Sequence, residues 1–162
     1  MHLKRGPTAL REGVRRVVGR PWRQQARVGD TRSMNKDDLL AAGLDVRRDV
    51  LGADYVDNGL AESDDFMMAF QDAVTSLAWG YSWSRPGLDR RTRLILTLGI
   101  LAGLGRHREL GIYAQGAVRN GVSVDELKEI LIHVTSYCGT PAGHQSFVAV
   151  HQALADIGAL TD

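Results

Sequence analysis

Apolar residues recur at three- and four-residue spacing from Met34 onward, and no stretch alternates with the period of two that is typical of a strand. Residues 36–51 carry such a pattern, which predicts a helix that ends before Gly52. A second helix is predicted after Ser63, where two aspartates favour the positive end of a helix. We expect its apolar stripe to face the core; the stripe consists of Phe66, Met67, Phe70, Val74, Leu77 and Ala78.

Four more helices are predicted in the second half of the chain. Residues 79–88 read WGYSWSRPGL and are expected to form a loop, because Pro86-Gly87 is a strong turn signal. The helices that follow are expected at 89–104, 106–120, 123–138 and 141–157. The first of these is apolar almost all round after Arg93, which indicates a buried central helix. Six helices with short connections predict a single-domain all-α bundle.

Composition sets limits on the class of protein. A chain of 162 residues with 44% hydrophobic and 24% charged residues has room for one globular domain. Its longest apolar run, 94–104, falls short of the roughly 20 residues that a membrane span needs. Cys138, the single cysteine, excludes an internal disulfide, and we expect it to be a small buried side chain. These features predict a cytoplasmic protein that binds no membrane.

Charge is concentrated at the N-terminus. Residues 1–33 carry nine Lys and Arg against Glu12 and Asp30, a net charge of +7, whereas the remainder has 11 basic and 17 acidic residues, a net charge of −6. An Arg-rich arm can bind nucleic acid or anionic lipid, but too few apolar residues repeat there to dock it on a domain. We therefore expect 1–33 to be a disordered extension with no nucleic-acid partner, and 34–162 to be the folded domain. Met34 is a candidate for an alternative start of translation.

Three strings of residues carry a resemblance to a known family. They are GLDVRRDVLGADYVD at 43–57, DFMMAFQDAVTSLAWGYSWSRPGLDRRTRLILTL at 65–98 and RNGVSVDELKEILIHVTSYCGTPAG at 119–143. In this order they resemble the carboxymuconolactone decarboxylase family. The resemblance implies an all-helical fold of the alkylhydroperoxidase-D-like type and a ring-shaped homo-oligomer, commonly a hexamer. It also implies decarboxylation of 4-carboxymuconolactone to the β-ketoadipate enol-lactone in the protocatechuate branch of aromatic catabolism.

The same superfamily contains thiol peroxidases, which carry CxxC followed by a helical His. One low-pKa thiolate attacks the peroxide there, and the second thiol resolves the sulfenic acid. Measured back from Gly121, the two cysteines would fall at Arg106 and Glu109 and the His at Tyr113. None of the three is present, so the resemblance favours the decarboxylases. These usually have His where this chain has Tyr113, which leaves the substrate open.

Decarboxylation of the lactone requires few groups from the protein. The electrons left by CO2 flow into the unsaturated ring, so that no cofactor or metal is implied. The protein must bind the retained carboxylate, donate to the oxygen where charge develops, and supply a proton to carbon. For the carboxylates we single out Arg85, before the Pro-Gly turn, and Arg93, near the start of the central helix, because Arg binds carboxylates in a bidentate manner. An ion pair with an acidic residue is the alternative for each.

The predicted proton donor is His133, at the edge of an apolar helix face. Glu129 lies one turn before it and could orient the ring and raise its pKa. A satisfied core histidine is the alternative. Glu109 and Tyr113, also one turn apart, form a second polar stripe, and Tyr113 could donate to the lactone oxygen. His144 and His151 are seven residues apart, about 10.5 Å of helical rise, which is too far to share one metal ion.

Two other functions stay open on the sequence. A related enzyme could act on another small lactone or on an anion that resembles a β-keto acid, and Tyr113 is the residue that supports this alternative. A non-catalytic binding module would use the same scaffold without chemistry. Incubation of the purified protein with the lactone separates these alternatives.

Overall fold

The computed structural model describes residues 33–160, and every regular element within this range is helical. In chain order the elements are α2 (Lys36–Leu51), α3 (Ala53–Ala61), α4 (Asp65–Val74), the π-helix η2 (Thr75–Trp83), α5 (Arg90–Gly103), α6 (His107–Arg119), α7 (Val124–Cys138) and α8 (Thr140–Asp156). The predicted all-α class is thus confirmed. Apart from Ser33, the expected N-terminal extension lies outside the described residues. No helix in the described range is long and apolar enough to cross a membrane.

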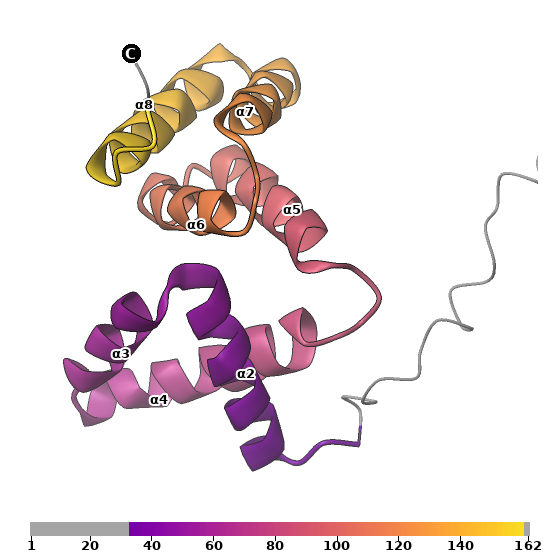
Figure 1. Ribbon diagram of the computed structural model, residues 1–162, viewed down its shortest axis with the longest axis vertical. Coiled ribbons are helices and arrows are strands. Elements are labelled where there is room, and N and C mark those ends of the chain that lie inside the picture. The colour runs from indigo at the N-terminus through magenta and orange to yellow at the C-terminus, as the bar shows by residue number, and fades with distance from the viewer. Residues whose placement is uncertain (1–32, 161–162) are drawn as a thin grey trace, which may run out of the picture.

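The helices form two groups along the long axis of the molecule. Figure 1 shows α2, α3 and α4 at one end and α5 to α8 at the other. Within the second group α6 and α7 both pack on α8, while α5 contacts α6 and α7. Contacts between α2 and α6 join the two groups. The apolar side chains that the core buries completely include Val50, Val56, Leu94, Leu98, Leu110, Val122 and Leu127.

A close crossing of α2 and η2 organises the first group. A Cβ atom on Gly43 would lie 2.1 Å from the carbonyl oxygen of Thr75, and one on Gly80 would lie 2.0 Å from that of Leu39. Only glycine lets the two backbones approach so closely. The crossing therefore fixes the distance between α2 and the residues of η2.

Two elements differ from the prediction. The structure has seven α-helices in its described part where six were expected, because α3 was not predicted; this helix has nine residues, of which only Val56 is buried. Residues 79–83 were predicted as the start of a loop, but they continue the helix in the π form as far as Trp83. The turn is confined to 84–89, around the Pro-Gly pair.

The apolar stripe of the second predicted helix does not face the core as expected. Phe66 is 85% exposed, Phe70 58% and Leu77 66%, whereas Gln71, Thr75, Ser76 and Trp79 are buried. The prediction was wrong because periodicity identifies an apolar face without identifying what covers it.

Two further expectations of burial were also wrong. The predicted central helix, α5, is buried along Leu94, Leu98 and Ala102 but exposes Leu96, Ile100 and Leu104 on its other side. Cys138, which was expected to be buried, is exposed at the end of α7. The described chain therefore presents apolar surface on more than one helix.

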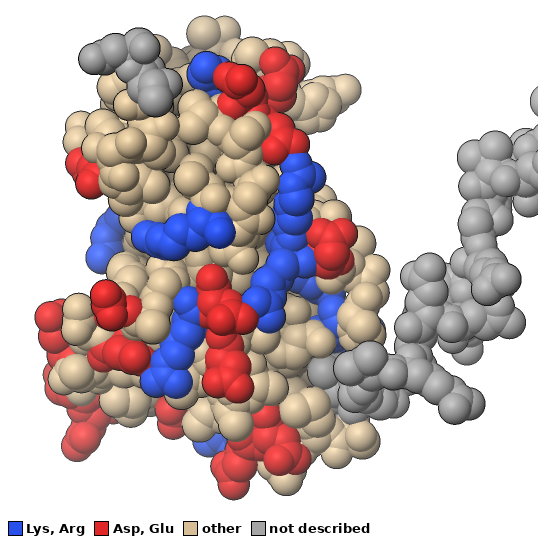
Figure 2. All heavy atoms as spheres, in the orientation of Figure 1, with Lys and Arg blue, Asp and Glu red and all other residues tan. Residues whose placement is uncertain are grey.

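Charged side chains alternate in sign where the two groups of helices meet. Figure 2 shows basic side chains across the middle of one face, next to acidic ones. Ion pairs link Arg48 to Asp57 and Arg90 to Asp49. Exposed pairs of this kind contribute little to stability individually.

Candidate active site

A guanidinium group lies half-buried between α2, α4 and η2. Arg47 projects from α2, and its Nη1 donates hydrogen bonds to Gln71 Oε1 of α4 at 2.9 Å and to Thr75 Oγ1 of η2 at 3.0 Å. No carboxylate in the described range forms an ion pair with Arg47, and its Nε atom is buried without an acceptor. Burial lowers the pKa of Arg47, although the guanidinium stays protonated. The structure thus holds a desolvated cation that only neutral acceptors contact.

Aromatic side chains gather beside this cation. The rings of Trp79 and Tyr113 are stacked, with centroids 6.0 Å apart and planes 6° apart. Trp83 contacts both, at 4.8 Å from Trp79 and 6.2 Å from Tyr113. Trp79 is fully buried and Trp83 partly buried, so the three rings form an apolar wall that α6 and η2 share.

Tyr113 is held in its neutral form. Burial raises the pKa of Tyr113 to about 12; the positive charge of Arg47 opposes this shift and Tyr55 adds to it. No hydrogen bond involving the Tyr113 hydroxyl occurs among the described residues. The phenol is therefore a proton-bearing donor near a cation, without a protein acceptor.

A second glycine contact sets the position of Tyr113 relative to α2. A Cβ atom on Gly116 would lie 2.6 Å from the carbonyl oxygen of Val50, so α6 can approach α2 only where this glycine stands. Tyr113 precedes Gly116 by one turn, and Arg47 precedes Val50 by one turn. The two close approaches, of α2 to η2 and of α2 to α6, thus bring the cation and the phenol together.

A chain of hydrogen bonds holds the acceptor of Arg47 in place. Gln71 Nε2 donates to Ser63 Oγ at 3.3 Å, and that hydroxyl donates to the Gly59 carbonyl oxygen at 2.7 Å. Because these bonds use the amide NH2 of Gln71, its oxygen is left to accept from Arg47. The guanidinium is therefore positioned by three elements of the fold.

The predicted carboxylate-binding pair, Arg85 and Arg93, lies together after η2. Arg93 Nη2 donates to the Arg85 carbonyl oxygen at 2.8 Å, and the Arg85 guanidinium lies over the Tyr81 ring, 5.4 Å from its centroid. Burial, and then the charge of Arg85, lower the pKa of Arg93, whose Nε atom is buried without an acceptor. Neither side chain forms an ion pair within the described range, so the alternative of a salt bridge does not apply there.

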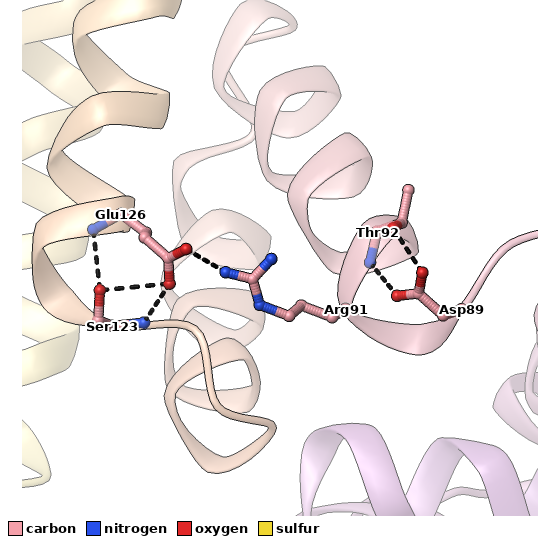
Figure 3. A network of polar contacts seen from close by, with 5 residues as sticks. All are labelled: Asp89, Arg91, Thr92, Ser123 and Glu126. Atoms are coloured by element: carbon pink, nitrogen blue, oxygen red, sulfur yellow. Dashed lines mark hydrogen bonds and ion pairs between the residues drawn. The ribbon is translucent and has the colours of Figure 1, made fainter.

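The neighbouring basic residue at the start of α5 has a structural contact instead. Figure 3 shows Arg91 reaching Glu126, whose carboxylate also accepts from the backbone and hydroxyl of Ser123 in the predicted capping box. Hydrogen bonding from the Ser123 backbone, followed by the contact with Arg91, lowers the pKa of Glu126. Asp89 caps α5 in the same view by accepting from Thr92. These residues fix the start of α5 and with it Arg93.

The other predicted catalytic residues lie apart from the aromatic wall. His133 is exposed on α7, where its ring contacts that of Tyr137 at 4.6 Å, and Glu129 forms no ion pair with it. No hydrogen bond, ion pair or ring contact of the described chain joins His133 to Tyr113. Glu109 is half-exposed, and its nearest cation is Arg108 at 3.9 Å. The structure thus brings Arg85 to Arg93, but no hydrogen bond, ion pair or ring contact of the described residues joins Glu109 or His133 to Tyr113.

An open groove of about 380 Å³ runs between α6 and α8. Its lining includes His107, Gln115 and Asp156 but neither Tyr113 nor either tryptophan of the aromatic wall. It lacks an enclosed cation and belongs to another face of α6. The groups suited to binding an organic anion are those around Arg47 and Tyr113.

Comparison with known proteins decides the family. The sequence profile described as Carboxymuconolactone decarboxylase family matches residues 69–152. The 4-carboxymuconolactone decarboxylase of Acinetobacter baylyi is 39% identical over 125 residues, which cover 77% of this chain and 93% of that protein. The chain belongs to the carboxymuconolactone decarboxylase family. The nitrosuccinic acid decarboxylase npaB of Metarhizium robertsii is 40% identical over 119 residues, covering 74% of this chain and 83% of that protein. Both relatives support a decarboxylase activity here.

The family profile covers only part of the cluster. Trp79, Trp83 and Tyr113 fall within the matched segment, whereas Arg47 and Tyr55 precede it. Sequence reasoning selected Tyr113 but missed Arg47, which is followed by a second arginine on an amphipathic helix and has the pattern of a solvated residue. The one available signal was Gly43, one turn earlier, which marks where another backbone crosses α2.

Proposed function

We propose that this protein is a cofactor-free carboxy-lyase that converts 4-carboxymuconolactone to the β-ketoadipate enol-lactone in aromatic catabolism. The observation that carries the proposal is the similarity over 77% of the chain to the decarboxylase of that substrate. The half-buried, unpaired Arg47 beside the neutral Tyr113 supports it, because a doubly anionic lactone needs a cation and a donor.

The proposed reaction needs no external electron acceptor. The bond from ring carbon to carboxylate breaks, its electron pair enters the conjugated lactone, and CO2 leaves. The resulting dienolate is then protonated on carbon, and the second carboxylate is retained. Groups that stabilise the dienolate more than the substrate accelerate the step.

The roles of the predicted residues follow from this scheme. Arg85 and Arg93 bind substrate carboxylates near the N-terminus of α5. Tyr113 donates to the lactone oxygen, and Glu109 lies one turn away from it. His133 is the proton donor. Since His133 is exposed on α7 and apart from Tyr113, this role requires the site to be completed where subunits meet.

We also propose that the chain assembles into a homo-oligomer, with six subunits as the family resemblance implies. The exposed apolar residues of α4, η2 and α5 support it, because monomeric soluble proteins rarely expose several large apolar stripes. Burial of such stripes between subunits would remove them from water.

A nitro-substituted dicarboxylic acid is the second candidate substrate. It is favoured by the 40% identity to npaB and by Tyr113, which departs from the histidine usual in the lactone decarboxylases. A nitro group on the carbon that loses CO2 would accept the electron pair as a nitronate. The same cation and donor would then serve both chemistries.

The experiment compares both substrates on the purified full-length chain. We expect CO2 release and loss of lactone absorbance with 4-carboxymuconolactone, at a kcat/KM well above that for nitrosuccinate. The reverse preference would assign the second candidate. Release of CO2 from neither substrate, with tight binding of both, would instead identify a binding module.

A further inference from the structure

Arg47 differs from two nearby arginines that form ion pairs. Arg48, the next residue, pairs with Asp57 at 2.7 Å, and Arg90 pairs with Asp49. Arg47 is partly buried, yet it contacts only the neutral oxygens of Gln71 and Thr75. A desolvated cation without a counter-ion is costly, so the fold maintains an unfavourable charge at this position.

One edge of the Arg47 guanidinium has no protein acceptor among the described residues. Both hydrogen bonds of Arg47 leave from Nη1, and Nε is screened from solvent without an acceptor. The edge formed by Nη2 and Nε is the one to which two carboxylate oxygens bind side-on. An anion there would supply the missing acceptors and the missing charge.

The hydroxyl of Tyr113 complements this edge. The close approach of α6 to α2 at Gly116 brings Tyr113 to the same side as Arg47, and the Tyr113 hydroxyl has no protein acceptor among the described residues. A phenol that stays protonated in a desolvated site donates strongly to an oxygen on which negative charge develops. Trp79 and Trp83 cover the neighbouring space with apolar rings.

We propose that Arg47 and Tyr113 form a further part of the substrate site, in which Arg47, in addition to Arg85 and Arg93, binds the substrate carboxylate that is retained and Tyr113 donates to the electron-accepting group. The inference deepens the proposed function and rests on it for the reaction, though not for anion binding. Arg47 serves the retained carboxylate because a cation paired with the departing one would stabilise the substrate and not the neutral CO2 product. The ligand class is a small dicarboxylate.

The test uses succinate, a saturated dicarboxylate with no electron-accepting group, as a probe that binds without reacting. Trp79 and Trp83 beside Tyr113 supply a fluorescence signal, and calorimetry supplies a second one. We expect Arg47→Gln to weaken succinate binding at least ten-fold and to raise KM for the substrate, with Arg47→Lys intermediate. Arg48→Gln, the same change one residue away in an exposed ion pair, should leave both values within about two-fold.

A second variant separates a binding role from a structural one. Gln71→Glu keeps the size of the side chain but replaces the neutral acceptor of Arg47 with a carboxylate, which would form an ion pair with it. If Arg47 binds anions, this variant folds with unchanged helicity and thermal midpoint, or a raised one, yet loses succinate binding. If Arg47 only links helices, Gln71→Glu keeps both binding and turnover, and the proposal is overturned.

The remaining outcomes separate failure of this binding site from failure of the proposed reaction. Succinate binding that depends on Arg47, without turnover of lactone or nitrosuccinate, would retain this site and reject the proposed reaction. Turnover of the lactone with KM and succinate binding unchanged in Arg47→Gln would retain the reaction and reject the site. Equal losses in Arg47→Gln and Arg48→Gln, or no saturable succinate binding by the unmodified chain, would also reject it.

Discussion

At the scale of single residues, the chemistry of the candidate site depends on which groups lack a partner. Arg91 and Arg93 are two positions apart at the start of α5, but Arg91 pairs with Glu126 while Arg93 has no carboxylate partner in the described range. The sequence singled out Arg85, Arg93 and Tyr113 as candidates because each lies in a motif or a polar stripe. It missed Arg47, because burial of that side chain arises from the crossing of α2 and η2, which no local pattern encodes.

The proton donor can be assigned by comparing substitutions of His133, Glu129 and Tyr113. We expect His133→Asn to fold normally and to lose at least about 100-fold in kcat, since general acid catalysis contributes about 10² to 10⁴. Glu129→Gln should cause a smaller loss. Steady-state kinetics of each variant, with circular dichroism as the check on folding, measure this. Near-normal turnover in His133→Asn together with an inactive Tyr113→Phe would transfer the role to α6.

The pKa of Tyr113 leads to a prediction about alkaline stability. Because folding raises this pKa from 10.0 to about 12, the resulting stabilisation is complete below about pH 10 and is lost as pH rises toward 12. Between pH 9 and pH 11 the free energy of unfolding of the unmodified chain should fall by about 1 to 1.5 kcal/mol more than that of Tyr113→Phe. Urea unfolding at both pH values measures the difference. Equal losses in the two proteins would mean that the hydroxyl is solvated.

At the scale of elements, caps and turns followed from sequence better than the faces of helices. The capping box of Ser123 and Glu126, the helix at 36–51 and the Pro-Gly turn lie where local chemistry placed them. The π-helical continuation through Trp83 was missed because the aromatic residues of 79–83 carry no period that separates a π-helix from a loop. π-Helical turns are frequent at functional sites, and this one carries both tryptophans of the aromatic wall.

The crossing of α2 and η2 should not tolerate a methyl group. Gly43→Ala would place its Cβ 2.1 Å from the Thr75 carbonyl oxygen, so we expect a loss of about 1 to 3 kcal/mol in the free energy of unfolding. Gly59→Ala is the matched control, because nothing lies within 4 Å of its Cβ; in α3 it should stabilise by about 0.5 to 1 kcal/mol. Chemical denaturation of both variants measures these changes. A Gly43→Ala protein as stable as the control would show that the helices can separate without penalty.

At the scale of the whole molecule, large apolar side chains are exposed on several helices of the described chain. Phe66, Phe70 and Leu77 lie on one outward stripe of α4 and η2, and α5 and α7 add Ile100 and Ile132. This distribution could not be predicted from the sequence, because the same periodicity serves a face buried within a chain and one buried between chains.

A charge on the outward stripe should disrupt assembly without unfolding the subunit. Phe70→Glu places a carboxylate on a side chain that is 58% exposed, so we expect normal helicity and a smaller particle mass by light scattering. Ala41→Glu, an equal change of charge at an exposed position of α2, should keep the mass of the unmodified protein. A mass unaffected by Phe70→Glu would remove this stripe from the subunit contact.

The exposed Cys138 offers a way to detect contacts between molecules. Because Cys138 is the single thiol of the sequence and lies on the surface at the end of α7, a thiol-specific dye attaches at one defined position per molecule. The rate of that labelling depends on whether another molecule covers the end of α7. The labelling rate at rising protein concentration therefore measures the fraction of molecules in which this surface is covered, with no mutation introduced.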